Sequence, residues 1–310
     1  MRIDSYNIKC FLLLLLSIPV FTSVQASTLS HKTAKYLYDL NTDRTKNLLL
    51  PSDVVVNKGY KYVVDGGNHR VVVFDGKGKH QFSFGKQGKK KSEFKYPVGI
   101  DVAANGLVFV ADSGNKRIQV FNSKGKYIRQ FKVKSGRYRI RPIDVLVDEK
   151  NNELYVTGNE THEVLVFSLK GTFKRKWGGN GVGEGEFRYP ATLSHLKDGR
   201  IAVVDVLNSR VQVFTKDGKY SSQISGWGVI AGQLFRPKGI AVNNKGHIYI
   251  SDSYLNIIQV FEDSGQFLHV LKMKKDRQLM TPVGIGFDSR GQLHITEMRK
   301  NRISVFNVNP

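Results

Sequence analysis

One sequence unit recurs six times along the chain. The clearest copy runs from Tyr96 to Phe131 and reads YPVGIDVAANGLVFVADSGNKRIQVFNSKGKYIRQF. Its opening proline recurs at intervals of 45 to 48 residues, at Pro51, Pro97, Pro142, Pro190, Pro237 and Pro282. A phenylalanine later in the unit recurs in the same way, at Phe74, Phe121, Phe167, Phe214, Phe261 and Phe306. A period near 46 residues without a helical apolar pattern indicates one β unit repeated around an axis.

Each unit contains recognisable strands that alternate apolar and polar residues, as half-buried strands do. In the clearest unit they are residues 99–102, 107–110, 117–121 and 126–131. Turn pairs such as Asn105-Gly106 separate them, because glycine and asparagine adopt the positive φ of hairpin turns. The sequence therefore predicts an all-β fold, a six-bladed β-propeller of four-stranded antiparallel blades (NHL/TolB-like).

The sixth unit ends after its third strand, at Phe306. Residues 35–40 (KYLYDL) resemble the fourth strand of the other units and lie just before the first proline. We expect this N-terminal strand to pair with residues 302–306 and close the ring, which removes exposed sheet edges. The predicted propeller then covers residues 34–310.

The first 26 residues have the pattern of a secretory signal peptide. Arg2 and Lys9 are basic, residues 11–21 (FLLLLLSIPVF) are apolar, and Ala26 ends a small-residue cleavage site. The alternative is an uncleaved anchor. Residues 27–33 are expected to form a linker. Cleavage removes Cys10, the only cysteine, so we expect a secreted or periplasmic monomer without disulfides, cysteine-metal sites or a transmembrane segment.

The repeats resemble the NHL-repeat family of six-bladed propellers. Residues VVDGGNHRVVVF (63–74), VADSGNKRIQVF (110–121) and VVDVLNSRVQVF (203–214) carry the resemblance. It implies a fold rather than one activity, since the family includes RNA-binding propellers, extracellular sensor domains and a peptide-amidating lyase. No RING or kinase sequence accompanies the repeats, so we expect a stand-alone NHL-repeat protein.

An acidic residue lies nine positions before most of the recurring phenylalanines, at Asp65, Asp112, Asp205, Asp252 and Glu297. In four units an arginine follows five positions later, whereas the third unit has Gly158 and Glu163 instead. A ring of acids suggests metal binding. We favour a structural role, in which each carboxylate accepts turn N–H groups and pairs with its arginine.

Other polar residues offer two alternatives that involve metals. Asp53, Asp101 and Asp144, with Thr192 and Ser194, are predicted on the first strands around the central channel, where oxygen ligands suit calcium. His69 and His162 occupy one repeat position. The resemblance to a family that includes amidating lyases implies a zinc centre bound by histidines as a second alternative. The spacing shows no converging set of three or four zinc ligands. We therefore expect no cofactor, with calcium or zinc as the alternative, and no catalytic residue.

Charge is the strongest functional signal. The formal net charge is +22, and +21 without the signal peptide. The five segments joining each fourth strand to the next unit, which are expected on one face, contain sixteen basic and four acidic residues, a net +12. They are residues 85–97, 132–142, 178–190, 225–237 and 272–282. Such a face favours anionic partners.

The basic segments also contain aromatic residues, a combination that suits phosphates, bases and acidic sugars. The predicted ligand-binding residues are Lys89, Lys90, Lys91, Lys95, Arg137, Tyr138, Arg139, Arg141, Lys274 and Lys275. The expected partner is an anionic polysaccharide, lipopolysaccharide, a nucleic acid or an acidic protein.

Three classes of function remain open from the sequence. The first is a binding or scaffold module that uses this basic face. The second is an enzyme with a metal at the channel mouth, similar to a peptidyl-hydroxyglycine lyase or a lactonase. The third is a purely structural scaffold in an envelope complex. The alternative to a binding face is a basic surface that is only solvated.

Overall fold

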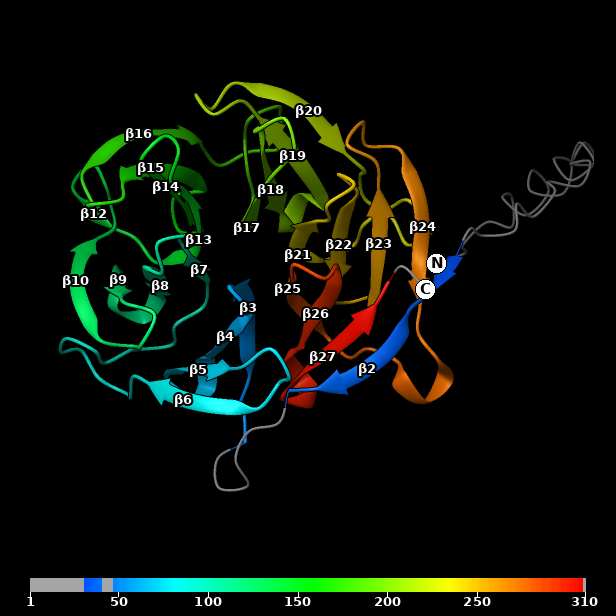
Figure 1. Ribbon diagram of the computed structural model, residues 1–310. Coiled ribbons are helices and arrows are strands. Elements are labelled where there is room, and N and C mark those ends of the chain that lie inside the picture. The colour runs from blue at the N-terminus through cyan, green and yellow to red at the C-terminus, as the bar shows by residue number, and fades with distance from the viewer. Residues whose placement is uncertain (1–30, 41–46, 309–310) are drawn as a thin grey trace, which may run out of the picture.

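Six small sheets stand around a central axis and form a ring (Figure 1). The computed structural model describes residues 31–40 and 47–308. In each blade the strand that follows the repeat proline is innermost, and the fourth strand forms the rim. The predicted all-β, six-bladed propeller is confirmed.

Blades 1 to 3 follow one another along the chain. Blade 1 contains β3 (Pro51–Asn57), β4 (Tyr60–Asp65), β5 (Arg70–Phe74) and β6 (His80–Phe84). Blade 2 contains β7 (Ile100–Val102), β8 (Val108–Asp112), β9 (Arg117–Phe121) and β10 (Tyr127–Lys132). Blade 3 contains β13 (Pro142–Asp148), β14 (Glu153–Gly158), β15 (Glu163–Ser168) and β16 (Phe173–Gly178). A short hairpin of β11 (Lys134–Ser135) and β12 (Tyr138–Arg139) joins blades 2 and 3.

Blades 4 to 6 complete the ring. Blade 4 contains β17 (Pro190–His195), β18 (Ile201–Asp205), β19 (Arg210–Phe214) and β20 (Tyr220–Ile224). Blade 5 contains β21 (Pro237–Val242), β22 (Ile248–Asp252), β23 (Ile257–Phe261) and β24 (Phe267–Lys272). Blade 6 contains β25 (Pro282–Phe287), β26 (Gln292–Glu297), β27 (Arg302–Asn307) and β2 (Lys35–Asp39).

The N-terminal strand closes blade 6 as the sequence predicted. Strand β2 pairs antiparallel with β27, with Tyr36 opposite Phe306 and Asp39 opposite Ser304. Leu40 N donates a hydrogen bond of 2.9 Å to Ile303 O. The N-terminal β2 and the last strand, β27, thus lie side by side in one sheet (Figure 1).

The chain just before β2 differs from the expectation. Residues 27–33 were predicted to be a linker, but His31–Thr33 form β1, which pairs parallel with β24 of blade 5. Residues 27–30 and the predicted signal peptide lie outside the described residues. The N-terminal segment therefore joins two blades, because β1 extends blade 5 and β2 completes blade 6.

The hydrophobic core lies between neighbouring blades. Each buried cluster combines strands of two adjacent blades, as Val64 and Val73 of blade 1 pack with Val110 and Phe121 of blade 2. The recurring phenylalanines are almost fully buried, and Phe121 and Phe214 contact aromatic residues of the loop that enters their own blade, Phe94 at 5.6 Å and Phe187 at 5.4 Å between ring centroids. Within the described ranges, helical structure consists of short 3₁₀ turns, and none has the length or apolar content that crossing a bilayer requires.

The two faces of the ring are built from different connections between strands. One face, here called the loop face, consists of the segments between blades and the turns between second and third strands. Its turns include η1 (Gly66–Asn68), η2 (Ser113–Asn115), η3 (Val206–Asn208) and η5 (Met298–Lys300), and η4 (Lys275–Arg277) lies in a segment between blades. The opposite face consists of the remaining hairpins of each blade.

Deleting residues 34–40 should make the protein insoluble or lower its melting temperature strongly, because β27 would become an exposed edge. The measurement is thermal unfolding of the soluble fraction. Lys35→Ser is the matched control, since this side chain is exposed on the same strand. A deletion variant that melts like the parent would contradict the closure.

Candidate functional site

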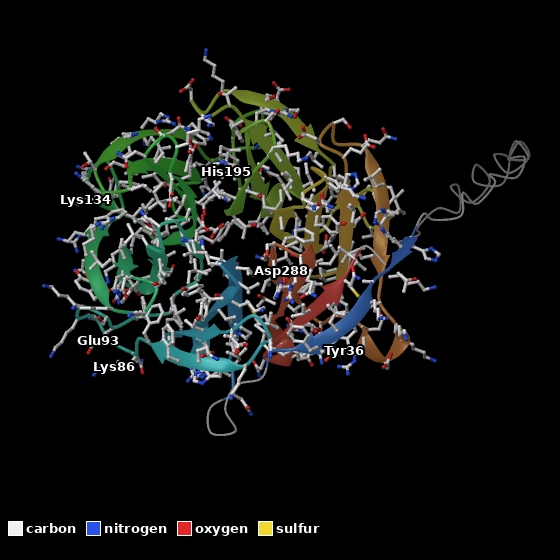
Figure 2. The ribbon with its side chains drawn as sticks, in the orientation of Figure 1. Tyr36, Lys86, Glu93, Lys134, His195 and Asp288 are labelled. Carbon is white, nitrogen blue, oxygen red and sulfur yellow. The ribbon has the colours of Figure 1, made fainter. Side chains whose placement is uncertain are left out.

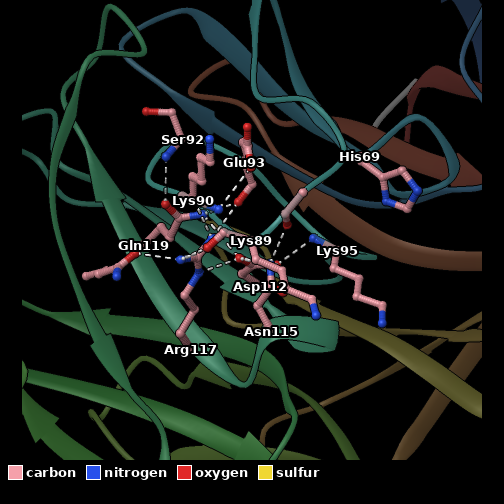
Figure 3. Close-up of polar contacts among 12 residues, drawn as sticks. His69, Lys89, Lys90, Ser92, Glu93, Lys95, Asp112, Asn115, Arg117 and Gln119 are labelled. Carbon is pink, nitrogen blue, oxygen red and sulfur yellow. Dashed lines mark hydrogen bonds and ion pairs between the residues drawn. The ribbon is translucent and has the colours of Figure 1, made fainter.

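The three-lysine loop between β6 and β7 has a rigid frame. Phe94 N donates to Lys86 O at 2.8 Å, and Gly88 N donates to Phe94 O at 2.9 Å. The buried Arg117 guanidinium donates to the carbonyl oxygens of Lys89, Lys90 and Glu93 at 2.9, 2.8 and 2.6 Å (Figure 3). These hydrogen bonds fix the loop backbone on its buried side, and the side chains of Lys89, Lys90 and Lys91 are exposed to solvent.

One acid fixes both the arginine and the loop. The Asp112 carboxylate is fully buried and accepts hydrogen bonds from Lys95 N at 2.8 Å and Arg117 Nε at 2.7 Å (Figure 3). Gln119 Nε2 also donates to Asp112, at 3.1 Å. The carboxylate is thus saturated by protein donors, which supports a structural role.

Blades 1, 4, 5 and 6 repeat the bond between the loop and the acid. In these blades the acid at the end of the second strand accepts a backbone N–H from the loop 16 or 17 residues earlier, in the pairs Asp65–Leu49, Asp205–Arg188, Asp252–Phe235 and Glu297–Met280. The structural interpretation of the acids is therefore confirmed. The sequence predicted that the turn after the second strand would supply the N–H groups. The structure shows that the loop entering the blade also supplies one to each of these acids.

Blade 3 departs from the pattern for a steric reason. A Cβ at Gly158 would lie 2.4 Å from Ile140 Cδ1, so a side chain there cannot fit without movement. Glu163, in place of the arginine, forms an ion pair with Lys176. The segment entering this blade is the β11–β12 hairpin instead of the framed loop, and it carries Arg137, Tyr138 and Arg139.

The structure brings part of the predicted basic set together in one cleft of about 390 Å³. Lys89 from the three-lysine loop, Lys132 from the end of β10 and Arg139 from β12 line it, together with Asn115, Arg117, Gln130 and Phe131. No acidic side chain lines the cleft, and Lys132 was not predicted as a ligand-binding residue. Lys132 could have been found from the sequence, since it directly follows the predicted strand 126–131 and opens the basic segment 132–142.

The remaining predicted residues lie around this cleft or apart from it. The Arg137 guanidinium lies 5.0 Å from the Tyr138 ring centroid and donates to its hydroxyl at 2.8 Å. Arg141 and Lys116 both pair with Glu160, at 3.5 and 3.1 Å, which partly neutralises them. Lys95, Lys274 and Lys275 are exposed but do not line the cleft.

An acidic side chain within the three-lysine loop is turned toward its own backbone. Glu93 Oε2 accepts a hydrogen bond from Lys90 N at 2.9 Å, and this bond together with nearby lysines lowers the pKa of Glu93. Lys86 lies 3.8 Å from the same carboxylate. Figure 2 shows Lys86 and Glu93 together at the edge of the ring, with Lys134 farther along the same side.

The predicted channel residues line a central cavity of about 220 Å³, where Asp53, Asp101 and Asp144 join Thr192 and Ser194. Each carboxylate spans two blades. Asp53 accepts from Ile100 N at 3.0 Å, Asp101 from Val147 N at 2.7 Å and Asp144 from Leu193 N at 2.9 Å. These side chains hold neighbouring first strands together.

Burial dominates the electrostatics of the channel. It raises the pKa of Asp53 to about 7 and also raises the pKa of Asp101 and of Asp144, where Asp53 repels the second charge. Within residues 31–40 and 47–308, no group of three or more His, Cys, Asp or Glu side chains is arranged to hold a metal ion. The calcium and zinc alternatives gain no support from the geometry of these residues.

The two histidines at one repeat position have a structural function. His69 Nδ1 accepts from Tyr96 N at 3.0 Å, and His162 Nδ1 accepts from Tyr189 N at 3.1 Å. Asn256 and Asn301, at the same repeat position, accept from Thr281 N at 2.6 Å and Leu50 N at 2.8 Å. This position therefore ties each turn to the next blade's entry loop.

Comparisons with known proteins agree with the fold. A model described as an NHL repeat matches residues 94–121, and one described as a 6-bladed beta-propeller matches residues 191–280. The chain is thus a six-bladed β-propeller. More particularly, the unit at residues 94–121 matches the NHL repeat, which agrees with the resemblance of the sequence to that family.

One curated relative and several solved structures are similar. Protein brain tumor of Drosophila melanogaster is 29% identical over 162 residues, which cover 52% of this chain and 11% of that protein. The match thus spans about a tenth of the curated relative.

A streptogramin B lyase structure aligns with TM-score 0.65 and 15% identity, covering 89% of this chain and 98% of the other. Virginiamycin B lyase from Staphylococcus aureus, in an inactive form with quinupristin, aligns with TM-score 0.64 and 16% identity, covering 88% and 85%. A protein of unknown function from Bacteroides thetaiotaomicron aligns with TM-score 0.67 and 15% identity, covering 90% and 74%. At these identities the likeness concerns the fold alone.

Asp112→Ala should lower the free energy of unfolding by about 3 kcal/mol, because it leaves the buried Arg117 without its partner. Chemical denaturation measures this loss. Asp276→Ala, which removes an exposed acid from the loop face, is the control and should change stability little. Equal stability of Asp112→Ala and the parent would refute the structural role.

The buried channel carboxylates should make stability depend on pH. The pKa of Asp53 is raised from 3.8 to about 7 by folding, so its stabilising contribution is full below about 3.8 and is lost as the pH rises through about 7. Between about pH 5 and pH 8, the parent should lose about 2 kcal/mol more stability than Asp53→Asn, which stays neutral. Burial also lowers the pKa of His294, to about 4, but this effect is common to both proteins. Identical pH profiles would contradict the burial of a protonated Asp53.

Proposed function

We propose that this propeller is a binding module that holds an anionic polymer or acidic protein on its loop face. The observation that carries the proposal is the cleft between blades 2 and 3. There Lys89, Lys132 and Arg139 converge without an acidic side chain. Three cations at one cleft attract a phosphate, sulfate or carboxylate group more strongly than scattered surface charges do.

The surroundings of the cleft extend this attraction along the face. The segments between blades have a net charge of +12, and ten of their sixteen basic residues lie in 85–97 and 132–142. Tyr138 is exposed beside Arg137, and the Lys91 Nζ lies 5.8 Å from the Tyr127 ring. Cations beside aromatic rings suit a chain of anionic groups with stackable rings, such as a polysaccharide or a nucleic acid.

The channel supports binding over catalysis. Asp53, Asp101 and Asp144 each use their oxygens on backbone N–H groups of neighbouring strands. A metal-dependent lyase or lactonase would need such carboxylates free to bind an ion. Export as a secreted or periplasmic protein forms part of the proposal and rests on the sequence of residues 1–26 alone.

Charge reversal of the loop face should abolish retention on heparin. The variant replaces Lys89, Lys90, Lys91, Arg137, Arg139 and Arg141 with Glu. Retention of the parent should weaken steeply with salt, because each neutralised anionic group releases a counterion and the Debye length shrinks to about 8 Å at physiological ionic strength. The measurement is the salt concentration of elution.

The matched control reverses six exposed lysines in hairpins of the opposite face, at Lys77, Lys79, Lys124, Lys126, Lys170 and Lys219. Lys216 is excluded because it pairs with Asp148 at 3.4 Å. The control should keep most of the heparin retention. Equal losses in both variants would show that only bulk charge acts, and the binding-face proposal would fail.

A further inference from the structure

One loop frame occurs three times on the loop face. Residues 85–96, 178–189 and 225–236 share the same register relative to the next blade. In each, a glycine N–H bonds the carbonyl of the buried residue six positions later, in the pairs Gly88–Phe94 at 2.9 Å, Gly181–Phe187 at 3.2 Å and Gly228–Leu234 at 2.9 Å. A buried glutamine of the following blade also bonds each loop, and these residues are Gln119, Gln212 and Gln259.

The three frames present different side chains at equivalent positions. Where the first loop has Lys89-Lys90-Lys91, the second has Val182-Gly183-Glu184 and the third has Val229-Ile230-Ala231. Trp227 occupies the position of Gln87. In the third loop the apolar side chains project into solvent, with Trp227 71% exposed, Val229 63% and Ile230 65%. We call Trp227, Val229 and Ile230 the apolar tip.

A neighbouring turn adds an exposed ring that contacts the same loop. Tyr254, from the turn between β22 and β23, is 65% exposed, and its ring lies against that of Phe235 with centroids 4.6 Å apart and the planes tilted by 42°. Segment 225–237 contains no acidic residue, and its single basic residue is Arg236. Exposed apolar groups that cluster in this way mark interaction sites, since isolated ones are what a soluble surface ordinarily shows.

The ring places the apolar tip opposite the lysines. The three-lysine loop joins blades 1 and 2, and the apolar tip joins blades 4 and 5, so half of the six-bladed ring separates them on either side (Figure 1). Because both loops have the same frame, both tips project from the same face. A broad, flat partner that meets one tip also meets the other.

We propose that the loop face docks on an anionic lipid surface, with the apolar tip inserted at the boundary between headgroups and acyl chains. This inference rests on the proposed function, because the basic half of the face supplies the attraction to anionic headgroups. Trp is the side chain that prefers the membrane interface, and neighbouring aliphatic residues bury into the acyl boundary.

The chemistry of the tip favours a lipid surface over a polymer strand. A tryptophan such as Trp227 is able to stack on a base or a sugar ring, but Val229 and Ile230 lack the flat faces that stacking needs. All three side chains of the tip are more than 60% exposed, and none of them lines the basic cleft or the central cavity. An exposed apolar loop on the same face as the three-lysine loop complements a soft, anionic and internally apolar layer.

Intrinsic tryptophan fluorescence tests this directly. The chain has two tryptophans, and Trp177 Nε1 has no hydrogen-bond partner, so Trp177→Phe costs no such bond and leaves Trp227 as the reporter. This variant is mixed with vesicles of phosphatidylcholine and phosphatidylglycerol, or of phosphatidylcholine alone. We expect a blue shift and quenching by bromine-labelled lipid with the anionic vesicles only. No shift would overturn the proposal.

Vesicle co-sedimentation of substituted proteins supplies the second arm. The variant with Trp227→Ser, Val229→Ser and Ile230→Ser should bind anionic vesicles about tenfold or more weakly than the parent, with unchanged heparin retention. The control, Tyr60→Ser, Ile128→Ser and Phe173→Ser, removes three exposed apolar side chains elsewhere and should bind like the parent.

The outcomes separate this inference from the proposed function. A parent that binds heparin but not anionic vesicles would overturn the lipid docking and leave the polyanion module intact. Equal vesicle binding by the tip variant and the parent would overturn the role of the tip. A parent that binds neither probe would refute the proposed function and the lipid docking with it.

Discussion

The loop face depends on hydrogen bonds to a buried carboxylate at the end of a blade's second strand. In blade 2, Asp112 holds Arg117, and Arg117 in turn holds the carbonyls of the three-lysine loop. A buried ion pair stabilises only when its remaining hydrogen bonds are made, and here the loop backbone makes them. The scaffold therefore fixes the loop from within and leaves its side chains free to differ between blades.

A second set of contacts holds the blades to one another. At the channel, carboxylates such as Asp53 accept N–H groups from the adjacent first strand, and at the loop face His69 and its equivalents accept from the next entry loop. The N-terminal segment adds a third tie through β1 and β2. Acids, histidines and asparagines at regular positions thus stabilise the ring, and their recurrence reflects its symmetry.

Much of this was predictable because the repeat period carries it. The strands, the six blades, the closing role of residues 35–40 and the structural role of Asp112 all follow from alternation and spacing. The pairing of His31–Thr33 with β24 was missed, since three residues carry no periodic signal. The cleft was missed as well, because Lys132 and Arg139 converge only through the β11–β12 hairpin, which breaks the repeat. Charge counting found the basic half of the face and overlooked Trp227, although aligning the loops by their prolines places it at the position of Gln87, two residues before Lys89.

The central claim is that anionic ligands meet the loop face through the three-lysine loop and the β11–β12 hairpin. Amide hydrogen exchange with and without heparin tests it most directly, because protection reports which backbone segments become ordered or covered. The account predicts added protection in residues 85–97 and 132–142, with little change in the opposite-face hairpins at 75–79 and 122–126. Protection confined to those hairpins, or spread equally over both faces, would contradict it.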